Sequence, residues 1–280
     1  MRAFVLGGGG NRGAYEVGML EALAERGIHP DFVVGTSIGA VNGAAIAADP
    51  TIAGAHRLAD HWLRVSDDNP FELSLWRTAA TALRSRTHLI DPGPAEEFVR
   101  SIVGVDRIED LRVPFATVAA CIETSTEAWF TEGPVVDAVM ASAALPGVFP
   151  PRVIDGKHYL DGGLVNSIPV ERAIERGATE LFVLQVGHIS EPLEPPSNPF
   201  ELAMVAFEVS RRHRFLGEIA AVPEEVTVHV LPTGEEGRGS FNDPAKLKVT
   251  DTSSVRRRIE RAHEATHEYL KTHGYPLATP

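Results

Sequence analysis

The chain of 280 residues is poor in cysteine, in positive charge and in long apolar runs, and each shortage excludes a class of protein. Its one cysteine, Cys121, cannot form an intramolecular disulfide, and the apolar run around it predicts a buried strand residue rather than a nucleophile. With 26 Lys and Arg against 38 Asp and Glu, the net charge of −12 argues against nucleic-acid binding and against electrostatic docking on anionic lipid. No apolar run approaches the ~18 residues of a membrane span, and 3–6 is too short for a signal-peptide core. We therefore expect a cytoplasmic protein.

What the sequence does contain is an ordinary globular composition in which strand and helix patterns alternate. A strand is expected at 3–6, a helix at 14–26, a second strand at 31–34 and a helix of small residues at 38–48, which predicts a parallel sheet with right-handed crossovers. Later elements are expected as strands at 113–122, 128–130, 181–186 and 226–231, a hairpin at 153–160, and helices at 135–142, 199–220 and 252–272. We expect one α/β domain over 1–280, with a mostly parallel central sheet flanked by helices on both faces.

A glycine-rich loop at Gly8–Gly13 follows the first strand and fits the Gly-x-Gly-x-x-Gly pattern of dinucleotide sites. Those sites need an acidic residue at the end of the second strand, but Asp31 begins that strand and Gly35-Thr36-Ser37 closes it, so nucleotide binding is disfavoured. Such a loop can instead hold an anion, because glycines allow close approach and a helix start offers free N–H groups. A transition-state oxyanion is one such anion. Arg12 either adds a cation there or braces the loop.

A second motif, Gly35-Thr36-Ser37-Ile38-Gly39, is Gly-x-Ser-x-Gly at a strand-to-helix junction, which is the setting of a nucleophile elbow. The plain alternative is a tight turn with a helix-capping serine, but the setting favours Ser37 as a nucleophile. Such a serine needs a base. His158 alternates along a hairpin strand and is expected to be structural, and His188 is a weaker candidate. Asp161-Gly162-Gly163 follows a strand and by itself is typical of a turn.

In this order, the segments 8–13, 35–39 and 161–163 resemble the motifs of the patatin-like phospholipase family, and 141–151 resembles the segment before that family's aspartate. The resemblance covers about 3–175 and is weak beyond 190, so 190–272 is expected to be a C-terminal extension of the same domain. It implies a Ser–Asp dyad without histidine, with Ser37 as nucleophile and Asp161 as base. It also implies an oxyanion hole made by the backbone N–H groups of Gly8, Gly9 and Gly10. The positions that would support the motifs are Arg12, Gly13, Gly35, Gly39, Gly162 and Gly163. Gly7 and Asn11 depart from the residues that are frequent in the family without touching this chemistry.

The implied dyad makes a physical demand on Asp161. A free aspartate has a pKa near ~3.9 and is a poor base for a hydroxyl. Burial would raise that pKa, so we expect Asp161 to be shielded and within hydrogen-bond reach of Ser37.

The resemblance implies a serine lipid acyl hydrolase that cleaves fatty-acyl ester bonds of lipids or phospholipids without a cofactor. The expected partner is a lipid or acyl-ester substrate, with no nucleic acid and at most transient contact with a membrane surface. The alternatives are a short-chain carboxylesterase acting on soluble esters, and a non-catalytic lipid- or nucleotide-binding regulator with the same fold.

A third motif, His263-Glu264-Ala265-Thr266-His267, matches the His-Glu-x-x-His pattern of zinc proteases. His273 falls where one subfamily has its third ligand, but that geometry needs a glycine where this chain has Leu270. A continuing helix would carry His273 about 15 Å along its axis from His263, too far to share one ion. The helix is also charged throughout, which is typical of a solvated face. We therefore expect no metal.

Two segments are candidates for a lipid-facing surface. The segment Phe71–Trp76 and apolar residues of 199–220 could form an acyl groove or lid, although core packing is the simpler interpretation. Arg211-Arg212-His213-Arg214 could meet a lipid phosphate, although a solvated helix face is simpler. Because the chain is acidic, it would need such a local surface to reach an anionic bilayer.

Overall fold

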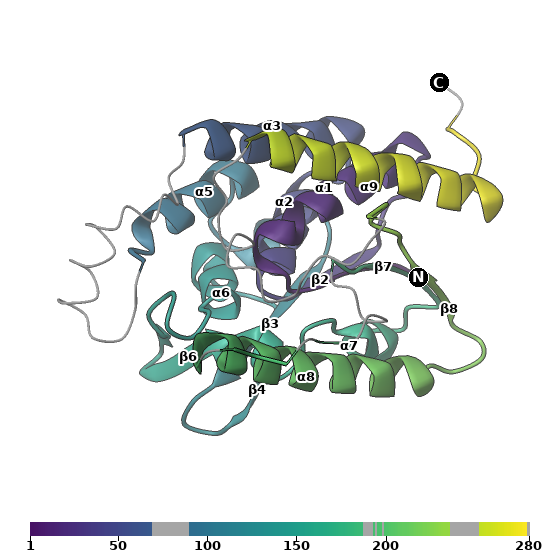
Figure 1. The fold of residues 1–280 in the computed structure, drawn as a ribbon. Helices are drawn as coiled ribbons and strands as arrows, with labels where there is room; N and C mark the ends of the chain where they lie inside the picture. Colours follow the sequence, from purple (N-terminus) through teal and green to yellow (C-terminus); the bar gives the residue numbers. More distant parts are fainter. Residues whose placement is uncertain (69–89, 187–192, 194, 198, 236–251, 279–280) are drawn as a thin grey trace.

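Parallel strands form the centre of the eight-stranded sheet in the computed structural model, which describes residues 1–68, 90–186, 193, 195–197, 199–235 and 252–278 (Figure 1). β1 (Arg2–Leu6) lies between β2 (Phe32–Gly35) and β7 (Glu180–Leu184), and β3 (Phe115–Cys121) and β8 (Thr227–Val230) extend this parallel run on either side. Three antiparallel strands complete the sheet beside β3, namely β4 (Thr126–Phe130), β5 (Arg152–Ile154) and β6 (Lys157–Asp161). The expected mostly parallel α/β sheet is confirmed.

Helices cover both faces of this sheet (Figure 1). One face carries most of them, namely α1 (Gly13–Glu25), α2 (Ile38–Ala48), α3 (Ile52–Asp68), α5 (Gly93–Val103), α6 (Val135–Ser142) and α9 (Thr252–Thr272). The other face carries α7 (Val170–Glu175) and α8 (Pro199–Ala220). Alternation along β1 supplies both cores, because Phe4 and Leu6 pack toward the first layer while Ala3 and Val5 pack toward the second.

Most expected elements are present with bounds shifted by one or two residues, and those of α2, α6, α8 and α9 coincide with the expected ones. The helix α7 was not expected, because six residues are too few to show a helical period. Cys121 is buried in β3, as predicted. The segment Phe71–Trp76 and His188 lie outside the described residues. Among the helices that are described, none has the length and apolar character needed to cross a membrane.

The registers at β3 show how the fold brings two distant segments together. Thr117 pairs with both β2 and β4, while Ala119 pairs with both β6 and β4, so β2 and β6 share the edge of β3 that faces away from β4. β2 runs parallel to β3 and ends at Gly35, opposite Thr117, whereas β6 runs antiparallel and ends at Asp161, opposite Ala119. The carboxyl ends of the two strands therefore face each other across a gap of two residues, or roughly 7 Å.

Candidate active site

The turn from β2 into α2 holds Ser37 in a strained backbone conformation. Its φ of 56° and ψ of −123° lie in a region that L-residues rarely adopt, at a cost on the order of 1–3 kcal/mol. The flanking glycines are required by contact with backbone atoms: a Cβ on Gly35 would lie 2.2 Å from the carbonyl oxygen of Gly39, and one on Gly39 would lie 2.4 Å from that of Leu6. The local geometry is that of a nucleophile elbow.

Ser37 and Asp161 meet at the gap between β2 and β6. The Ser37 hydroxyl donates to Asp161 Oδ2 at 2.7 Å, and the Gly163 N–H donates to Asp161 Oδ1 at 2.7 Å. Asp161 is only 2% exposed, and this burial raises its pKa from 3.8 to about 6, although the two hydrogen bonds oppose the rise. The expected contact and shielding are both present. Near neutral pH the group is mainly a carboxylate that can accept the hydroxyl proton.

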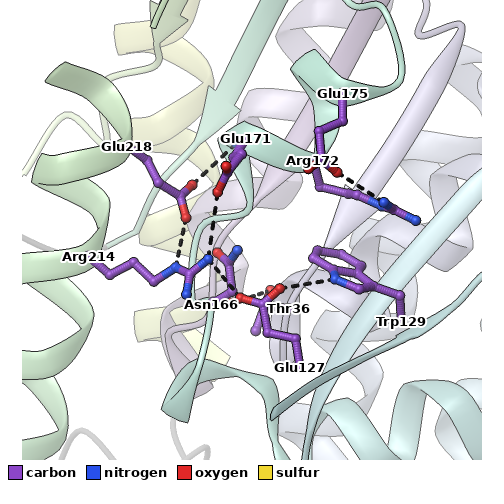
Figure 2. Close-up of polar contacts among 9 residues, drawn as sticks. All are labelled: Thr36, Glu127, Trp129, Asn166, Glu171, Arg172, Glu175, Arg214 and Glu218. Carbon is purple, nitrogen blue, oxygen red and sulfur yellow. Dashed lines mark hydrogen bonds and ion pairs between the residues drawn. The ribbon is translucent and has the colours of Figure 1, made fainter. Parts of the chain in front are cut away.

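Neighbouring polar groups fix the backbone on both sides of this contact. The Ser37 N–H donates to Ser142 Oγ at 2.9 Å. The Thr36 hydroxyl donates to the carbonyl oxygen of Asn166 at 2.9 Å (Figure 2). A Cβ on Gly162 would lie 2.1 Å from the carbonyl oxygen of Val118, so glycine lets the 3-10 turn η3 (Gly162–Leu164) pack on β3. Ser142 lies in the segment 141–151, which resembles the family's segment before its aspartate. No pattern in that segment predicts a role for Ser142.

The glycine loop lies beside Ser37, as the motifs suggested, but one of its three expected N–H donors is already engaged. A Cβ on Gly8 would lie 3.4 Å from the Ser37 Cβ, while the Gly8 N–H donates to the carbonyl oxygen of Ser167 at 2.9 Å. In this structure the Gly8 N–H is therefore engaged, and its expected role toward an oxyanion stays a prediction. Gly10 has a φ of 58° and begins the short helix η1 (Gly10–Arg12), where the first N–H groups lack partners within the helix.

Arg211 of α8 contacts the glycine loop at the carbonyl oxygen of Gly8. Its guanidinium is buried, with a side chain 6% exposed, and Nη1 donates to the carbonyl oxygen of Gly8 at 3.0 Å. Nε and Nη2 each donate to the Glu208 carboxylate at 2.8 Å. In a trans peptide the N–H points opposite to the carbonyl, so the Gly9 N–H points away from Arg211. The expected solvated face is thus wrong for Arg211, and the Glu208–Arg211 spacing of three was the only sequence signal for this pair.

Two further contacts brace the start of α1. Arg12 forms an ion pair with Glu235 at 2.9 Å, so it braces the loop rather than presenting a bare cation. Arg258 of α9 donates to the carbonyl oxygen of Asn11 at 3.2 Å. A Cβ on Gly13 would lie 2.4 Å from Ile38 Cγ1, so glycine also lets the starts of α1 and α2 pack closely. Segments beyond 190 therefore hold the loop from several directions.

Two further arginines of α8 also face carboxylates, and one of them, Arg212, pairs with Glu208 at 2.9 Å. Arg214 pairs with Glu127 at 2.7 Å, with Glu218 at 2.8 Å and, more weakly, with Glu171 at 3.8 Å (Figure 2). Glu127 also accepts the Trp129 indole N–H at 3.0 Å. Arg214 thus links α8 to β4 and α7, which is a structural role rather than one of phosphate contact.

The remaining candidates divide between core and surface. Phe215 of α8 belongs to the core, whereas Leu202, Val209 and Leu216 are more than half exposed along the same helix. The side chains of Phe200 and Phe207 lie outside the described residues. His158 contacts Glu123 Oε1 at 2.7 Å on the β5–β6 hairpin, as expected of a structural histidine.

A strained serine beside a buried aspartate lies at the carboxyl ends of strands in an α/β sheet, where enzymes with a nucleophile elbow carry their serine. Comparison with known proteins is more specific. The Patatin-like phospholipase family matches residues 4–174, and the chain belongs to this family.

Several known proteins are similar to the chain in this region. The mouse patatin-like phospholipase domain-containing protein 7 is 32% identical over 68% of the chain and 14% of its own length. The lysophospholipase NTE1 of Yarrowia lipolytica is 35% identical over 67% of the chain and 13% of its own length. An uncharacterized NTE family protein of Mycobacterium bovis is 34% identical over 60% of the chain and 44% of its own length. The chain thus spans less than half the length of each of these relatives. The crystal structure of VipD from Legionella pneumophila aligns with a TM-score of 0.45 at 14% identity, over 97% of this chain and 67% of VipD.

Proposed function

We propose that the protein is a serine acyl hydrolase that cleaves fatty-acyl ester bonds of lipids or phospholipids. The observation that carries the proposal is the 2.7 Å hydrogen bond from the strained Ser37 to the buried Asp161. A hydroxyl bonded to a carboxylate whose pKa is about 6 is paired with a base suited to neutral pH. Membership of the patatin-like phospholipase family supports the same chemistry.

In the proposed acylation step, Ser37 Oγ forms a bond to the ester carbonyl carbon while its proton passes to Asp161. The carbonyl oxygen becomes an oxyanion, and we assign its stabilisation to the N–H groups of Gly9 and Gly10 rather than of Gly8. Arg211 would hold the peptide between Gly8 and Gly9 in the orientation that this requires. When the tetrahedral species collapses, the ester C–O bond breaks and the alcohol leaves with the proton from Asp161.

The second half of the cycle releases the acyl group. Asp161 takes a proton from water, whose oxygen attacks the acyl-serine carbonyl, and the same N–H groups receive the oxyanion. Collapse of this species returns the proton to Ser37 and frees the fatty acid. No step needs a cofactor, because one carboxylate acts as base and then as acid in each half.

The preference for lipid substrates rests on the family and on relatives that are named as lysophospholipases. A chain-length series of p-nitrophenyl esters, together with lysophosphatidylcholine, tests it on the purified protein and on Ser37→Ala and Asp161→Asn. We expect activity that rises with acyl length and that both substitutions abolish. Activity confined to acetate and butyrate esters would instead favour the short-chain carboxylesterase.

Fluorophosphonate labelling separates a catalytic role from a non-catalytic one. We expect the wild-type serine to be labelled and Ser37→Ala to remain unlabelled. Turnover by Ser37→Ala at the wild-type rate would refute Ser37 as the nucleophile. An unlabelled, inactive wild type would favour the non-catalytic regulator.

A further inference from the structure

The pair His263 and His267 lies on α9 at a spacing of four, so both imidazoles lie on one face of that helix. His273 is too far along the chain to be the third ligand of a zinc ion at this pair. The fold supplies a different third group, the carboxylate of Glu25, which is the last residue of α1. These two helices pack closely: a Cβ on Gly18 of α1 would lie 2.1 Å from the carbonyl oxygen of Ile259 on α9.

Three potential ligand atoms converge at this contact. Glu25 Oε2 lies 2.9 Å from His263 Nε2 and 3.8 Å from His267 Nδ1, and the three atoms lie within 4.8 Å of one another. Around a tetrahedral ion with bonds of about 2.0–2.1 Å, neighbouring ligand atoms are about 3.3 Å apart. Side-chain rotations alone could therefore bring the three atoms onto one ion.

The surroundings of His267 suit a ligand better than a structural hydrogen bond. Its Nδ1 is buried and has no hydrogen-bond partner among the described residues. The side chains of Glu25, His263 and His267 are 28–33% exposed, so an ion could enter from solvent and keep a water as fourth ligand.

We propose that Glu25, His263 and His267 form a binding site for a divalent transition-metal ion of the zinc type, which joins α1 to α9. Two imidazoles and one carboxylate suit zinc and its neighbours, whereas calcium and magnesium prefer ligand sets made of oxygen. This site is independent of the proposed hydrolase activity. Its expected role is structural, because it crosslinks helices 238 residues apart in sequence, and α9 also carries Arg258, which contacts the glycine loop.

The test uses the full chain without a polyhistidine tag, stripped of metal by a chelator that is then removed. Calorimetric titration with Zn²⁺ should give one ion per chain with a micromolar Kd, and Co²⁺ should develop the intense visible bands of a tetrahedral complex. The melting temperature should rise with Zn²⁺. Each of Glu25→Gln and His267→Ala should bind about tenfold or more weakly. His273→Ala, just beyond the end of α9 and outside the cluster, should bind like the wild type.

Circular dichroism without metal will show whether Glu25→Gln and His267→Ala fold. If one of them folds poorly, the other still tests the site. The proposal is overturned if the wild type binds no Zn²⁺, or if Glu25→Gln and His267→Ala bind it as tightly as the wild type. Equal weakening by His273→Ala would also overturn it, because the binding would then be a general property of surface histidines.

Discussion

Asp161 and Glu16 are both carboxyl groups enclosed by this fold, but their surroundings suit them to different tasks. Asp161 is reached by the Ser37 hydroxyl and the Gly163 N–H, and burial leaves its pKa at about 6. Glu16 is fully buried in α1, where the Asn42 amide donates to its Oε2 at 2.7 Å. Burial raises the pKa of Glu16 well above its usual 4.5.

The hydrogen-bond networks of Glu16 and Asp161 also reach different parts of the fold. Asn42 donates to the Gly13 carbonyl oxygen at 3.0 Å and accepts the Trp62 indole N–H at 2.9 Å, so the Glu16 network joins α1, α2 and α3. The Asp161 network ends at a strained serine. Burial alone therefore does not make a base; Asp161 differs from Glu16 because a serine hydroxyl contacts its carboxylate.

Glu208 gives a third case, with the opposite outcome. It is also buried, and burial opposes its ionisation, but Arg211 and Arg212 more than offset this and hold its pKa below the usual value. Burial thus raises the pKa of Glu16 and of Asp161, whereas the two arginines lower that of Glu208. The neighbouring groups, rather than depth, decide the direction of the shift.

The largest expected effect that separates Asp161 from Glu16 is on turnover. Asp161→Asn removes the proposed base and should lower kcat about 10³-fold, while Glu16→Gln, which keeps the shape and a neutral side chain, should stay within a few-fold of the wild type. Initial rates of ester hydrolysis, with circular dichroism to verify folding, measure both. An equally large loss in Glu16→Gln would mean that Glu16 takes part in the chemistry.

A smaller effect is expected in the pH dependence of kcat/KM on an uncharged ester. Asp161 must be ionised to act as base, so the rate should fall about tenfold per pH unit below about 6 and level off above it. Glu16→Gln should leave this midpoint in place, because Glu16 lies in a separate hydrogen-bond network. A midpoint near 4, as for a solvated aspartate, would contradict the link between burial and basicity.

The Glu208–Arg211 pair can be tested for its expected effect on the glycine loop. Replacing either residue alone would leave the other as a buried charge, so the double variant Glu208→Gln with Arg211→Met is preferable. Its control is Arg212→Met, which leaves the Glu208–Arg211 pair in place. We expect about a tenfold lower kcat only in the double variant, with an unchanged pH midpoint. A shifted midpoint would show that the pair acts on Asp161 instead of on the loop.

The sequence predicted these features unevenly, for physical reasons. Gly35–Gly39 identified Ser37 because the elbow depends on local sterics, which five residues encode. Asp161 emerged only through family resemblance, because Asp-Gly-Gly alone is typical of a turn and its partner depends on the register of β6 against β3. The burial of Arg211 was not foreseen, since its place in a basic run is typical of solvent exposure.

The other contacts that the sequence did not predict join residues that are far apart in the chain. The hydrogen bond from the Gly8 N–H to the Ser167 carbonyl oxygen joins residues far apart in the chain, and no local sequence pattern predicts it. The same holds for Glu25 beside His263 and His267. Helices α8 and α9 were predicted with their bounds, because long periodic patterns are strong signals, but their contacts with the glycine loop were not.

The last expected effect is on stability, and it tests burial directly. Because the folded-state pKa of Asp161 is about 6 and its usual value is 3.8, the folded protein is favoured most below pH 3.8 and loses up to about 3 kcal/mol as pH rises through 6. Asp161→Asn does not titrate and can keep both hydrogen bonds through its amide. Its unfolding free energy relative to the wild type should therefore increase from pH 4 to pH 8, as measured by urea denaturation at each pH. An inactive variant that is more stable at pH 8 would show that the protein maintains its base at a cost in stability, whereas a difference that does not change with pH would show that Asp161 is ionised as readily as in solvent.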